Sequence, residues 1–356
     1  MFLRILFCFS FFIVVYVQGQ PKVENSNKDI IFKENVISEI ASFYPSDEGL
    51  FRPELVVFDA IQHKVFIYDY GIRNLVSLKF EDSSNFNIIA FEEIGNGVGS
   101  GPGEFRNPTG ICLNNEKGVS RVVIVDPDLA KVSIWNGADG ELVKSFRPKK
   151  FVPFRVTCNS NGIALYNSGF HSDGSIAVYD YDGNLITYLA EPGRKKENVS
   201  MMENGHLAMN SENIFYSGTD EGILKKYSYL NKKFQEKVNF VEFKESKEKV
   251  VASKTNNEVT YKRNKESVFH SRGIGVNDKN VWVFYSGRKD AYGNLIDFYS
   301  VDNLAYEFSI KIAELAKGMV TNGRYIILDT FDFERRENYL KIFRLNDLPT
   351  KEKSVN

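Results

Sequence analysis

The sequence predicts an all-β fold: a six-bladed β-propeller of four-stranded antiparallel blades, with the ring closed by an N-terminal strand. Three observations point to it. Helical periodicity is nearly absent, and short runs rich in Val, Ile, Phe and Tyr alternate with polar turns along the chain. Units of such runs recur with a period of roughly 40 to 60 residues, which is typical of a propeller. Each blade is a small sheet that buries its faces only by stacking on its neighbours.

The first three units are the most regular part of this pattern. Each consists of short β-rich runs separated by polar turns. The predicted strands are 54–59, 64–69 and 75–80 in the first unit, 109–114, 121–126, 131–136 and 141–146 in the second, and 155–159, 162–166, 175–180 and 184–188 in the third.

The last three units vary more, and the sixth lacks a fourth strand. Their predicted strands are 198–202, 206–209, 214–216 and 224–228 in the fourth, 273–276, 280–285, 294–300 and 305–310 in the fifth, and 318–321, 324–329 and 340–345 in the sixth. A further strand pattern at 34–41 precedes the first unit. We expect it to pair with the last blade, because closing the ring removes a free sheet edge.

One segment does not fit the repeat. Residues 231–267 are rich in Lys and Glu and contain only weak strand patterns, at 238–242 and 258–261. We interpret this segment as a long outer strand of the fourth blade followed by a solvated loop. The alternative is a flap over one mouth of the propeller channel.

The N-terminus has the pattern of a secretory signal peptide. A positively charged start, Met1 to Arg4, precedes an apolar run at 5–17, and small or compact residues precede a cleavage point before Gln20. The run is shorter than the roughly 20 residues that a membrane-spanning helix needs. We therefore expect an exported protein, periplasmic or extracellular, that is soluble after cleavage and has no membrane anchor. The expected organisation is a signal peptide at 1–19, a flexible segment at 20–33, the propeller at 34–348 and a tail at 349–356.

The charge balance excludes two classes of partner. Lys and Arg together number 45 and Asp and Glu 46, which gives a net charge of −1. No overall field draws such a chain to nucleic acid or to an anionic membrane, so any charge-driven binding must use a local patch.

The mature chain keeps two cysteines, Cys112 and Cys158, each within an apolar strand pattern. When the two strands are aligned on the Asn that follows each of them, the cysteines are one position out of phase. Side chains alternate between the faces of a strand, so the thiols should point to opposite sides. The sequence therefore predicts two buried free thiols.

Two stretches carry a resemblance to known propellers. The glycine-rich run 95–105, followed by Asn107-Pro108-Thr109-Gly110-Ile111, resembles the signature between blades of NHL-repeat propellers. The run 284–288, together with 292–295, is similar to a blade of the TolB-like six-bladed propellers exported by Bacteroidetes-type bacteria. The resemblance implies the fold, export and a role for Phe105 as a plug between blades. It implies no activity, since function depends on sites rather than on the fold.

Motifs for catalysis and cofactors are absent from the sequence. The glycine-rich run lacks the Gly-Lys-Ser/Thr ending of a phosphate loop, and no Gly-x-Ser-x-Gly elbow occurs. The acidic run 180–184 is explained better by an Asp-Gly hairpin turn than by half of a calcium loop. No cofactor and no metal-binding residue are predicted, although a calcium or zinc ion remains an open alternative. The four histidines form no close pair; they are His63, His171, His206 and His270.

One constellation suggests a binding site. Basic residues recur close to the start of the predicted innermost strands, which in a propeller surround one mouth of the channel. They are Arg106, Arg155, Arg272 and Lys317, with Arg52 as a weaker member of the set. Converging guanidinium groups favour carboxylate, sulfate or phosphate groups on a ligand. The alternative is a set of solvated rim charges or ion pairs.

Aromatic residues accompany these basic positions. We interpret them as core between blades rather than as a platform for sugars; they are Phe51, Phe105, Phe151 and Phe154.

Taken together, the pattern favours a monomeric, non-enzymatic binding module that presents a face or a channel mouth to a peptide, a protein or an anionic glycan. The alternative is a hydrolase or lyase acting on a carbohydrate or an ester, with residues drawn from several blades. A scaffold subunit of an envelope complex is a third possibility.

Overall fold

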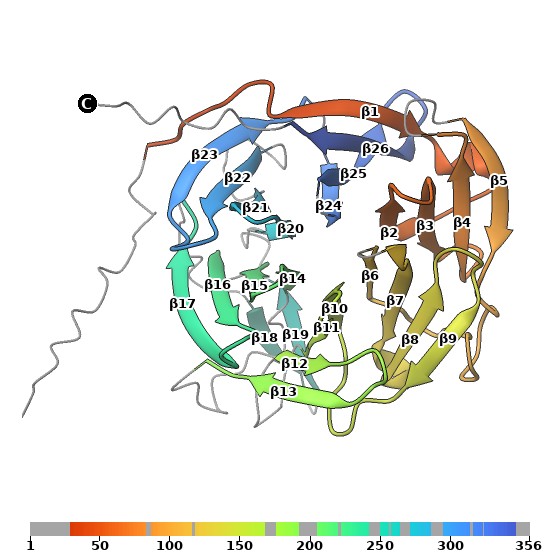
Figure 1. The fold of residues 1–356 in the computed structure, drawn as a ribbon, viewed down its shortest axis with the longest axis horizontal. Coiled ribbons are helices and arrows are strands. Elements are labelled where there is room, and N and C mark those ends of the chain that lie inside the picture. The colour runs from red at the N-terminus through yellow and green to blue at the C-terminus, as the bar shows by residue number, and fades with distance from the viewer. Residues whose placement is uncertain are drawn as a thin grey trace, which may run out of the picture.

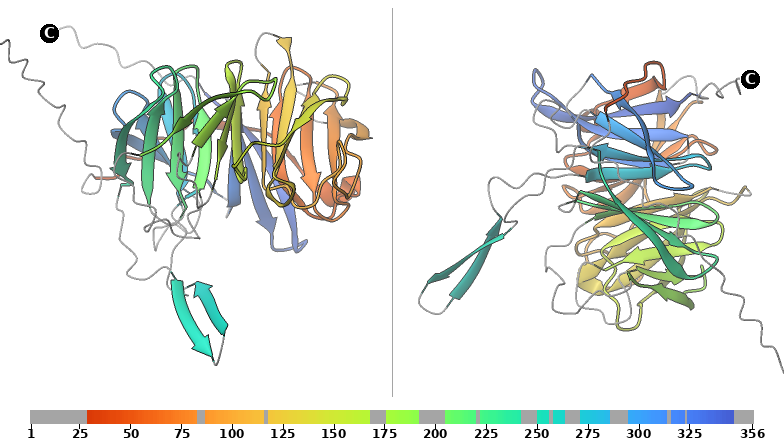
Figure 2. Two further views of the ribbon diagram at one scale, coloured as in Figure 1. Left: turned by 90° about the horizontal axis from the view of Figure 1, so that it is seen from below. Right: turned by 90° about the vertical axis from the view of Figure 1, so that its left-hand side faces the viewer.

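The computed structural model describes residues 29–82, 87–115, 118–167, 176–191, 205–219, 222–241, 250–255, 258–263, 271–285, 295–313, 316–322 and 324–346. Six four-stranded antiparallel sheets surround a central axis, as Figure 1 shows in the view along that axis. Figure 2 shows the ring from the side, with the blade strands running roughly along the axis. The predicted all-β, six-bladed architecture is confirmed.

Blades 1 to 3 follow one another in chain order, each starting at its innermost strand. Blade 1 comprises β2 (Pro53–Asp59), β3 (Lys64–Asp69), β4 (Asn74–Phe80) and β5 (Ile88–Glu93). Blade 2 comprises β6 (Gly110–Asn114), β7 (Arg121–Asp126), β8 (Lys131–Asn136) and β9 (Leu142–Phe146). Blade 3 comprises β10 (Arg155–Asn159), β11 (Gly162–Tyr166), β12 (Ile176–Tyr179) and β13 (Leu185–Leu189). The sequence missed only β5, whose alternation of half-buried and exposed residues gives a weak signal.

Blades 4 and 5 continue the same order. Blade 4 comprises β14 (Gly205–Met209), β15 (Asn213–Gly218), β16 (Ile223–Ser228) and β17 (Lys233–Asn239). Blade 5 comprises β20 (Ser271–Val276), β21 (Asn280–Tyr285), β22 (Leu295–Ser300) and β23 (Tyr306–Lys311). The strand predicted at 198–202 lies outside the described residues. The innermost strand of blade 4 is β14, and the outer strand predicted in the Lys- and Glu-rich segment is β17.

Blade 6 is built from both ends of the chain. Its strands β24 (Ala316–Asn322), β25 (Tyr325–Asp332) and β26 (Glu337–Leu345) come from the C-terminal end, and the outermost strand is β1 (Ile37–Phe43). β1 pairs antiparallel with β26, and the two lie side by side in Figure 1. The predicted closure by an N-terminal strand is confirmed.

The remainder of the Lys- and Glu-rich segment contains a separate hairpin. The strands β18 (Val250–Thr255) and β19 (Glu258–Arg263) pair with each other in a two-stranded sheet and with no other strand in the described ranges. Figure 2 shows this hairpin in turquoise, apart from the six blades. The segments that connect it, 242–249 and 264–270, lie outside the described residues, so the flap interpretation stays a prediction.

Apolar clusters fill the spaces between blades, and Phe105 illustrates how. Its ring is 1% exposed and lies 5.2 Å from that of Tyr68 in blade 1 and 6.2 Å from that of Trp135 in blade 2. The cluster around it joins Val57 of blade 1 to Ile124 of blade 2. Phe105 therefore plugs the gap between two blades, as the sequence resemblance implied.

Aspartates at the ends of second strands fix the backbone that enters a blade. In blade 1, Asp69 accepts hydrogen bonds from the N–H groups of its own turn and from the N–H of Arg52. In blade 2, Asp126 does the same for its turn and for the N–H of Arg106. Because each carboxylate satisfies several backbone donors, these side chains serve the fold rather than a ligand.

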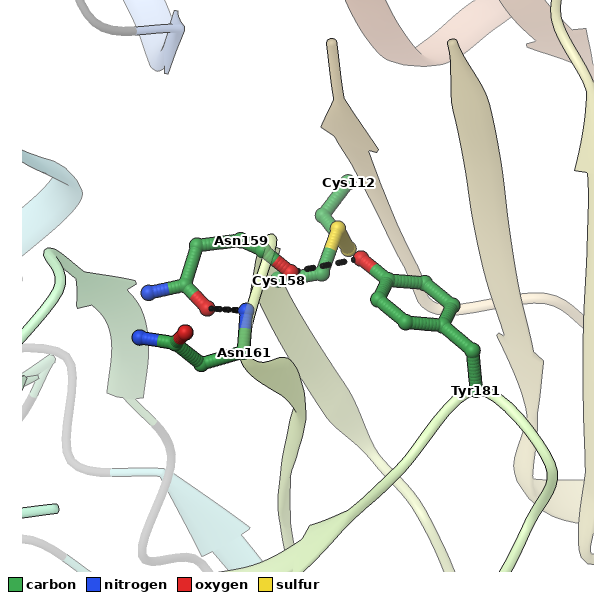
Figure 3. Close-up of a disulfide and its surroundings, with 5 residues drawn as sticks. All are labelled: Cys112, Cys158, Asn159, Asn161 and Tyr181. Atoms are coloured by element: carbon green, nitrogen blue, oxygen red, sulfur yellow. Dashed lines mark hydrogen bonds between the residues drawn. A yellow bond between two sulfur atoms is a disulfide. The ribbon is translucent and has the colours of Figure 1, made fainter. Parts of the chain in front are cut away.

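The two cysteines form a disulfide, which overturns the prediction of free thiols. Cys112 of β6 and Cys158 of β10 are bonded with their Cα atoms 6.0 Å apart (Figure 3). They do point to opposite faces of their own sheets. Blades stack face to face, however, so opposite faces of successive blades are the ones that meet. The phase difference that appeared to separate the thiols is what brings them together, in a cluster shared by blades 2 and 3.

Candidate functional site

The six innermost strands line a central cavity of about 1190 Å³. They are β2, β6, β10, β14, β20 and β24, and they converge on the axis in Figure 1. Since every blade has four antiparallel strands and begins at the axis, all six innermost strands run in the same direction. Their starts surround one mouth of the channel and their ends surround the other.

We call the first of these the start mouth. Polar and charged cavity-lining residues at the starts of the innermost strands, or beside those starts, define it: Arg52, Glu54, Tyr70, Arg155, His206, Arg272, Lys317 and Asp329. They come from blades 1, 3, 4, 5 and 6, so the start mouth collects residues that are far apart in the sequence.

The structure brings together three of the four predicted basic residues. Arg155, Arg272 and Lys317 line the cavity, as does the weaker candidate Arg52. Arg106 is exposed and is not among the lining residues. The backbone N–H of Arg106 donates to Asp126, just as that of Arg52 donates to Asp69 in blade 1. The two residues thus hold equivalent positions, but the side chain of Arg106 does not line the channel. Membership of Arg106 in the constellation is not supported by its position.

Arg155 is the most deeply buried of these cations. One terminal nitrogen, Nη1, donates to the carbonyl of Thr109, and the guanidinium carbon lies 4.6 Å from the ring centre of Phe154. Burial lowers the pKa of Arg155, against the opposing influence of Tyr70 and Tyr216. The Nε atom is buried and has no hydrogen-bond partner among the described residues. A buried donor without a partner is costly and is a candidate contact for a ligand.

His206 lies on the next blade, at the second position of β14. Burial, together with the nearby charge of Arg155, lowers its pKa to about 3, although a hydrogen bond with the backbone of Ser271 opposes the shift. The imidazole is therefore neutral at neutral pH. It adds a polar surface to the cavity but no charge.

Asp329 projects from β25 on the other side of the ring. Burial raises its pKa, Lys317 opposes the rise and Glu54 adds to it, and together these effects bring the pKa to about 6. Its Oδ1 is buried without a hydrogen-bond partner in the described part of the chain. The residue beside it on the innermost strand is Gly318. This glycine places no side chain between the carboxyl group and the lumen.

The remaining charged groups of the start mouth have partners. Arg52 and Glu54 form an exposed ion pair with 2.6 Å between nitrogen and oxygen. Lys317 donates to the side chain of Asn338 and lies 5.1 Å from the ring centre of Phe331. Tyr70 donates its hydroxyl proton to the carbonyl of Pro108, and burial raises its pKa to about 12. The Tyr70 hydroxyl is therefore protonated at neutral pH and donates to this carbonyl.

The aromatic residues near this mouth divide into two groups. Phe105 and Phe151 are buried, 1% and 2% exposed, as predicted for core between blades. Phe154 is half-buried against Arg155. Phe51 contradicts the prediction, because its ring is 77% exposed just before β2. It precedes the innermost strand by two residues, where no neighbouring blade covers it.

The opposite mouth is lined by amide side chains that serve turns. Asn159 accepts from the N–H of Asn161, and the carbonyl of Asn159 accepts from Tyr181, as Figure 3 shows. Asn210 and Asn277 cap the following turns in the same way, each accepting two backbone N–H groups. These contacts explain the Asn that recurs at the ends of the innermost strands.

Metal ligands do not gather in the described ranges, where no three His, Cys, Asp or Glu side chains converge. His171 and His270 lie outside those ranges. The acidic run 180–184 forms the predicted hairpin turn, with Gly183 at φ +79° and Asp180 accepting from the backbone and side chain of Asn184. This hydrogen bond lowers the pKa of Asp180.

Sequence reasoning missed four members of the start mouth: Glu54, Tyr70, His206 and Asp329. His206 and Glu54 occupy the same strand starts as the basic residues, so an analysis of every polar residue at those positions could have found them. Asp329 and Tyr70 come from second strands. No signal in the sequence places either at the axis.

No helix among the described residues is long and apolar enough to cross a membrane. A comparison with family models finds no match to this chain, and a comparison with curated proteins finds none either.

Solved structures do share the fold. A structure named "Putative exported protein" from Bacteroides fragilis is 13% identical, with a TM-score of 0.55, and the match covers 91% of this chain and 99% of that one. The Pan2 WD40 domain of Neurospora crassa is 10% identical, with a TM-score of 0.52, and covers 90% of this chain and 98% of its own. At these identities the likeness shows the propeller fold and nothing about the site.

Proposed function

We propose that this chain is an exported, non-enzymatic binding protein whose start mouth receives an anionic group of a peptide, a protein or a glycan. The observation that supports it best is the convergence of Arg155, Arg272 and Lys317, from three different blades, on the wall of one cavity.

The chemistry of Arg155 suits such a ligand. A guanidinium group offers donors in a rigid fork that matches the two oxygens of a carboxylate or the oxygens of a sulfate or phosphate. Its Nη1 is used by Thr109, whereas its buried Nε is not used. An anion bound here would offset the buried positive charge and accept a hydrogen bond from Nε. Charge-assisted hydrogen bonds are strongest in such a site, because little water competes for them.

Export and kinship with the TolB-like or NHL-repeat propellers belong to the same proposal. The signal-peptide pattern at 1–19 supports export, as does a neighbour in fold whose printed name calls it exported. The burial of Phe105 after the glycine-rich run agrees with the way the NHL-like signature is expected to act between blades.

One observation keeps the enzyme alternative in view. His206, Arg155 and Tyr70 are all cavity-lining residues, and Arg155 influences the pKa of both of the others. A neutral imidazole can accept a hydrogen bond from a substrate, and a nearby guanidinium can stabilise negative charge that develops on it, as a hydrolase or lyase acting on a carbohydrate or an ester would require. Incubating the protein with acidic oligosaccharides and small esters tests this, since a product lost in His206→Ala would establish catalysis.

The binding proposal is tested with the mature protein, residues 20–356, on an array of uronate- and sulfate-bearing oligosaccharides and acidic peptides beside their neutral counterparts. We expect retention of acidic probes only. The Arg155→Gln/Arg272→Gln variant should bind at least about tenfold more weakly, as the loss of charge-assisted hydrogen bonds requires. Arg106→Ala is the matched control and should bind like the parent.

Thermal melting of each variant separates lost binding from lost folding. If Arg155→Gln/Arg272→Gln does not fold, Arg272→Gln/Lys317→Gln removes two of the three cations from more accessible positions. Equal retention of acidic and neutral probes, or unchanged affinity in a folded variant, would overturn the proposal.

A further inference from the structure

Two side chains of opposite charge, each with one buried and unsatisfied polar atom, line the same cavity. The Nε of Arg155 and the Oδ1 of Asp329 are both buried, both lack a hydrogen-bond partner among the described residues, and both residues line the channel. Most buried polar groups have partners, so each of these exceptions calls for an explanation.

The two groups are placed where they cannot satisfy each other. Arg155 belongs to blade 3 and Asp329 to blade 6, and in a six-bladed ring these blades lie on opposite sides of the axis (Figure 1). The two groups also have different neighbours. Arg155 is influenced by Tyr70 and Tyr216, whereas Asp329 is influenced by Lys317 and Glu54. The lumen therefore separates a buried cation from a buried carboxyl group.

The other charged groups of the start mouth do not remove this asymmetry. Arg52 and Glu54 neutralise each other in an exposed pair. Lys317, on the same blade as Asp329, donates to Asn338 and keeps its charge, which opposes the rise in the pKa of Asp329 but gives its Oδ1 no hydrogen bond. His206 carries no charge at neutral pH. Arg272 adds a positive charge to the wall on the side of blades 3 to 5. The cavity thus has an unused guanidinium donor on the wall of blade 3, at Arg155, and an unused carboxyl oxygen on the wall of blade 6, at Asp329.

We propose that the start mouth selects zwitterionic ligands, short peptides with free termini, with the peptide carboxylate at Arg155 and the terminal ammonium at Asp329. This deepens the proposed function and depends on it, because the Arg155 end is the anion site already described. An anion alone would leave the Oδ1 of Asp329 without a hydrogen-bond partner. An ammonium satisfies a desolvated carboxylate better than a neutral hydroxyl does, because a charge-assisted hydrogen bond is roughly twice as strong.

The dimensions and the local structure agree with such an occupant. A volume of about 1190 Å³ exceeds the roughly 300 to 1000 Å³ of pockets for small organic ligands, so a tripeptide fits within it. Gly318, the partner of Asp329 on the innermost strand, carries no side chain. The exposed ring of Phe51 and the ring of Phe154 offer apolar surface beside the charged groups.

The experiment uses pools of random tripeptides in three forms: free at both ends, N-acetylated and C-amidated. Each pool is dialysed against the mature protein at pH 7.5, and the retained peptides are quantified by mass spectrometry. We expect the free pool to be retained about tenfold or more above either blocked pool, the factor that one charge-assisted hydrogen bond supplies. Asp329→Asn should lose the preference for a free amino end and keep the preference for a free carboxyl end.

A matched control uses the other mouth of the same cavity. Asp278 also lines the channel, at the ends of the innermost strands, so Asp278→Asn should leave the preference for free amino ends intact. Equal retention of free and N-acetylated pools, with the amidated pool lost, would overturn this inference and leave anion binding standing. Retention of acidic glycans, with no peptide pool retained, would also overturn the zwitterion inference and leave anion binding standing. Retention of no probe at all would overturn both proposals.

Discussion

The disulfide between Cys112 and Cys158 joins the innermost strands of two successive blades, β6 and β10, at the wall of the channel. Both residues are 8% exposed and are packed among apolar side chains of blades 2 and 3. The bond therefore fixes one of the six boundaries between blades next to the candidate site.

Replacing both cysteines, as Cys112→Ala/Cys158→Ala, should lower the free energy of unfolding by about 2 to 4 kcal/mol, the usual effect of removing a disulfide. The loop it closes spans 46 residues, so the unfolded chain gains freedom when the bond is lost. Urea unfolding of parent and variant measures the difference. A parent whose peptide map under non-reducing conditions shows two separate thiol peptides would contradict the bond itself.

Deleting β1 should abolish cooperative melting, because blade 6 then loses its outermost strand and the ring loses its closure. The strand contributes a ladder along β26 and an ion pair of 2.9 Å between Glu39 and Lys341. Differential scanning calorimetry compares a deletion of residues 30–43 with a control deletion of 20–28. Similar transitions in both would mean that the closure is dispensable.

Phe105→Ala should destabilise the protein by about 3 to 5 kcal/mol, the cost of emptying a packed aromatic site in a core. The ring fills the space between Tyr68 and Trp135, and little else could move into it. Phe51→Ala is the control, since that ring is 77% exposed and its loss should change the melting temperature little. Equal effects of the two variants would be inconsistent with the plug.

His206 should make the fold sensitive to acid. Its pKa falls from about 6.5 in the unfolded chain to about 3 in the fold, so the unfolded state binds the proton more tightly. Stability therefore decreases as the pH falls below 6.5. His206→Gln should flatten this part of the stability profile between pH 6.5 and 4, measured by urea unfolding at each pH. A profile that keeps the same slope in the variant would assign the effect to other groups.

Asp329 should have the opposite pH dependence. Its pKa rises from 3.8 to about 6 in the fold, so the native state binds the proton more tightly and loses stability as the pH rises from about 4 to 6. Asp329→Asn should therefore melt higher than the parent at pH 7.5 and like the parent at pH 4. A stabilising substitution at the proposed ligand contact would also show that the carboxylate is retained at the expense of stability.

The strand pattern predicted most of the architecture. Alternating apolar residues and polar turns located nearly every strand of blades 1, 2, 3, 5 and 6, and the spare strand at 34–41 correctly indicated the closure by β1. These features are local, because turn residues and period-2 alternation act within a few residues of one another. The outer strand β5 was missed because it has no buried residue, so its alternation of half-buried and exposed positions gives only a weak signal.

The strand pattern could not predict which side chains meet between successive blades. The phase of Cys112 and Cys158 was read correctly, but its meaning depends on which faces of successive sheets meet, and that is a property of the assembled ring. The start mouth shows the same limit. Arg155 and Arg272 could be recognised from strand starts, whereas Arg106, at an equally plausible position, has its side chain outside the lining.

The sequence by itself determined the blades, their order and the strand that closes the ring, because these follow from hydrophobic alternation and turn chemistry along the chain. Only the tertiary structure decided that the thiols bond, that Asp329 and His206 join the basic residues at one mouth, and that Arg155 and Asp329 line the channel with one buried, unsatisfied atom each. These relations arise from the radial stacking of sheets, which places residues more than 100 positions apart around a single axis.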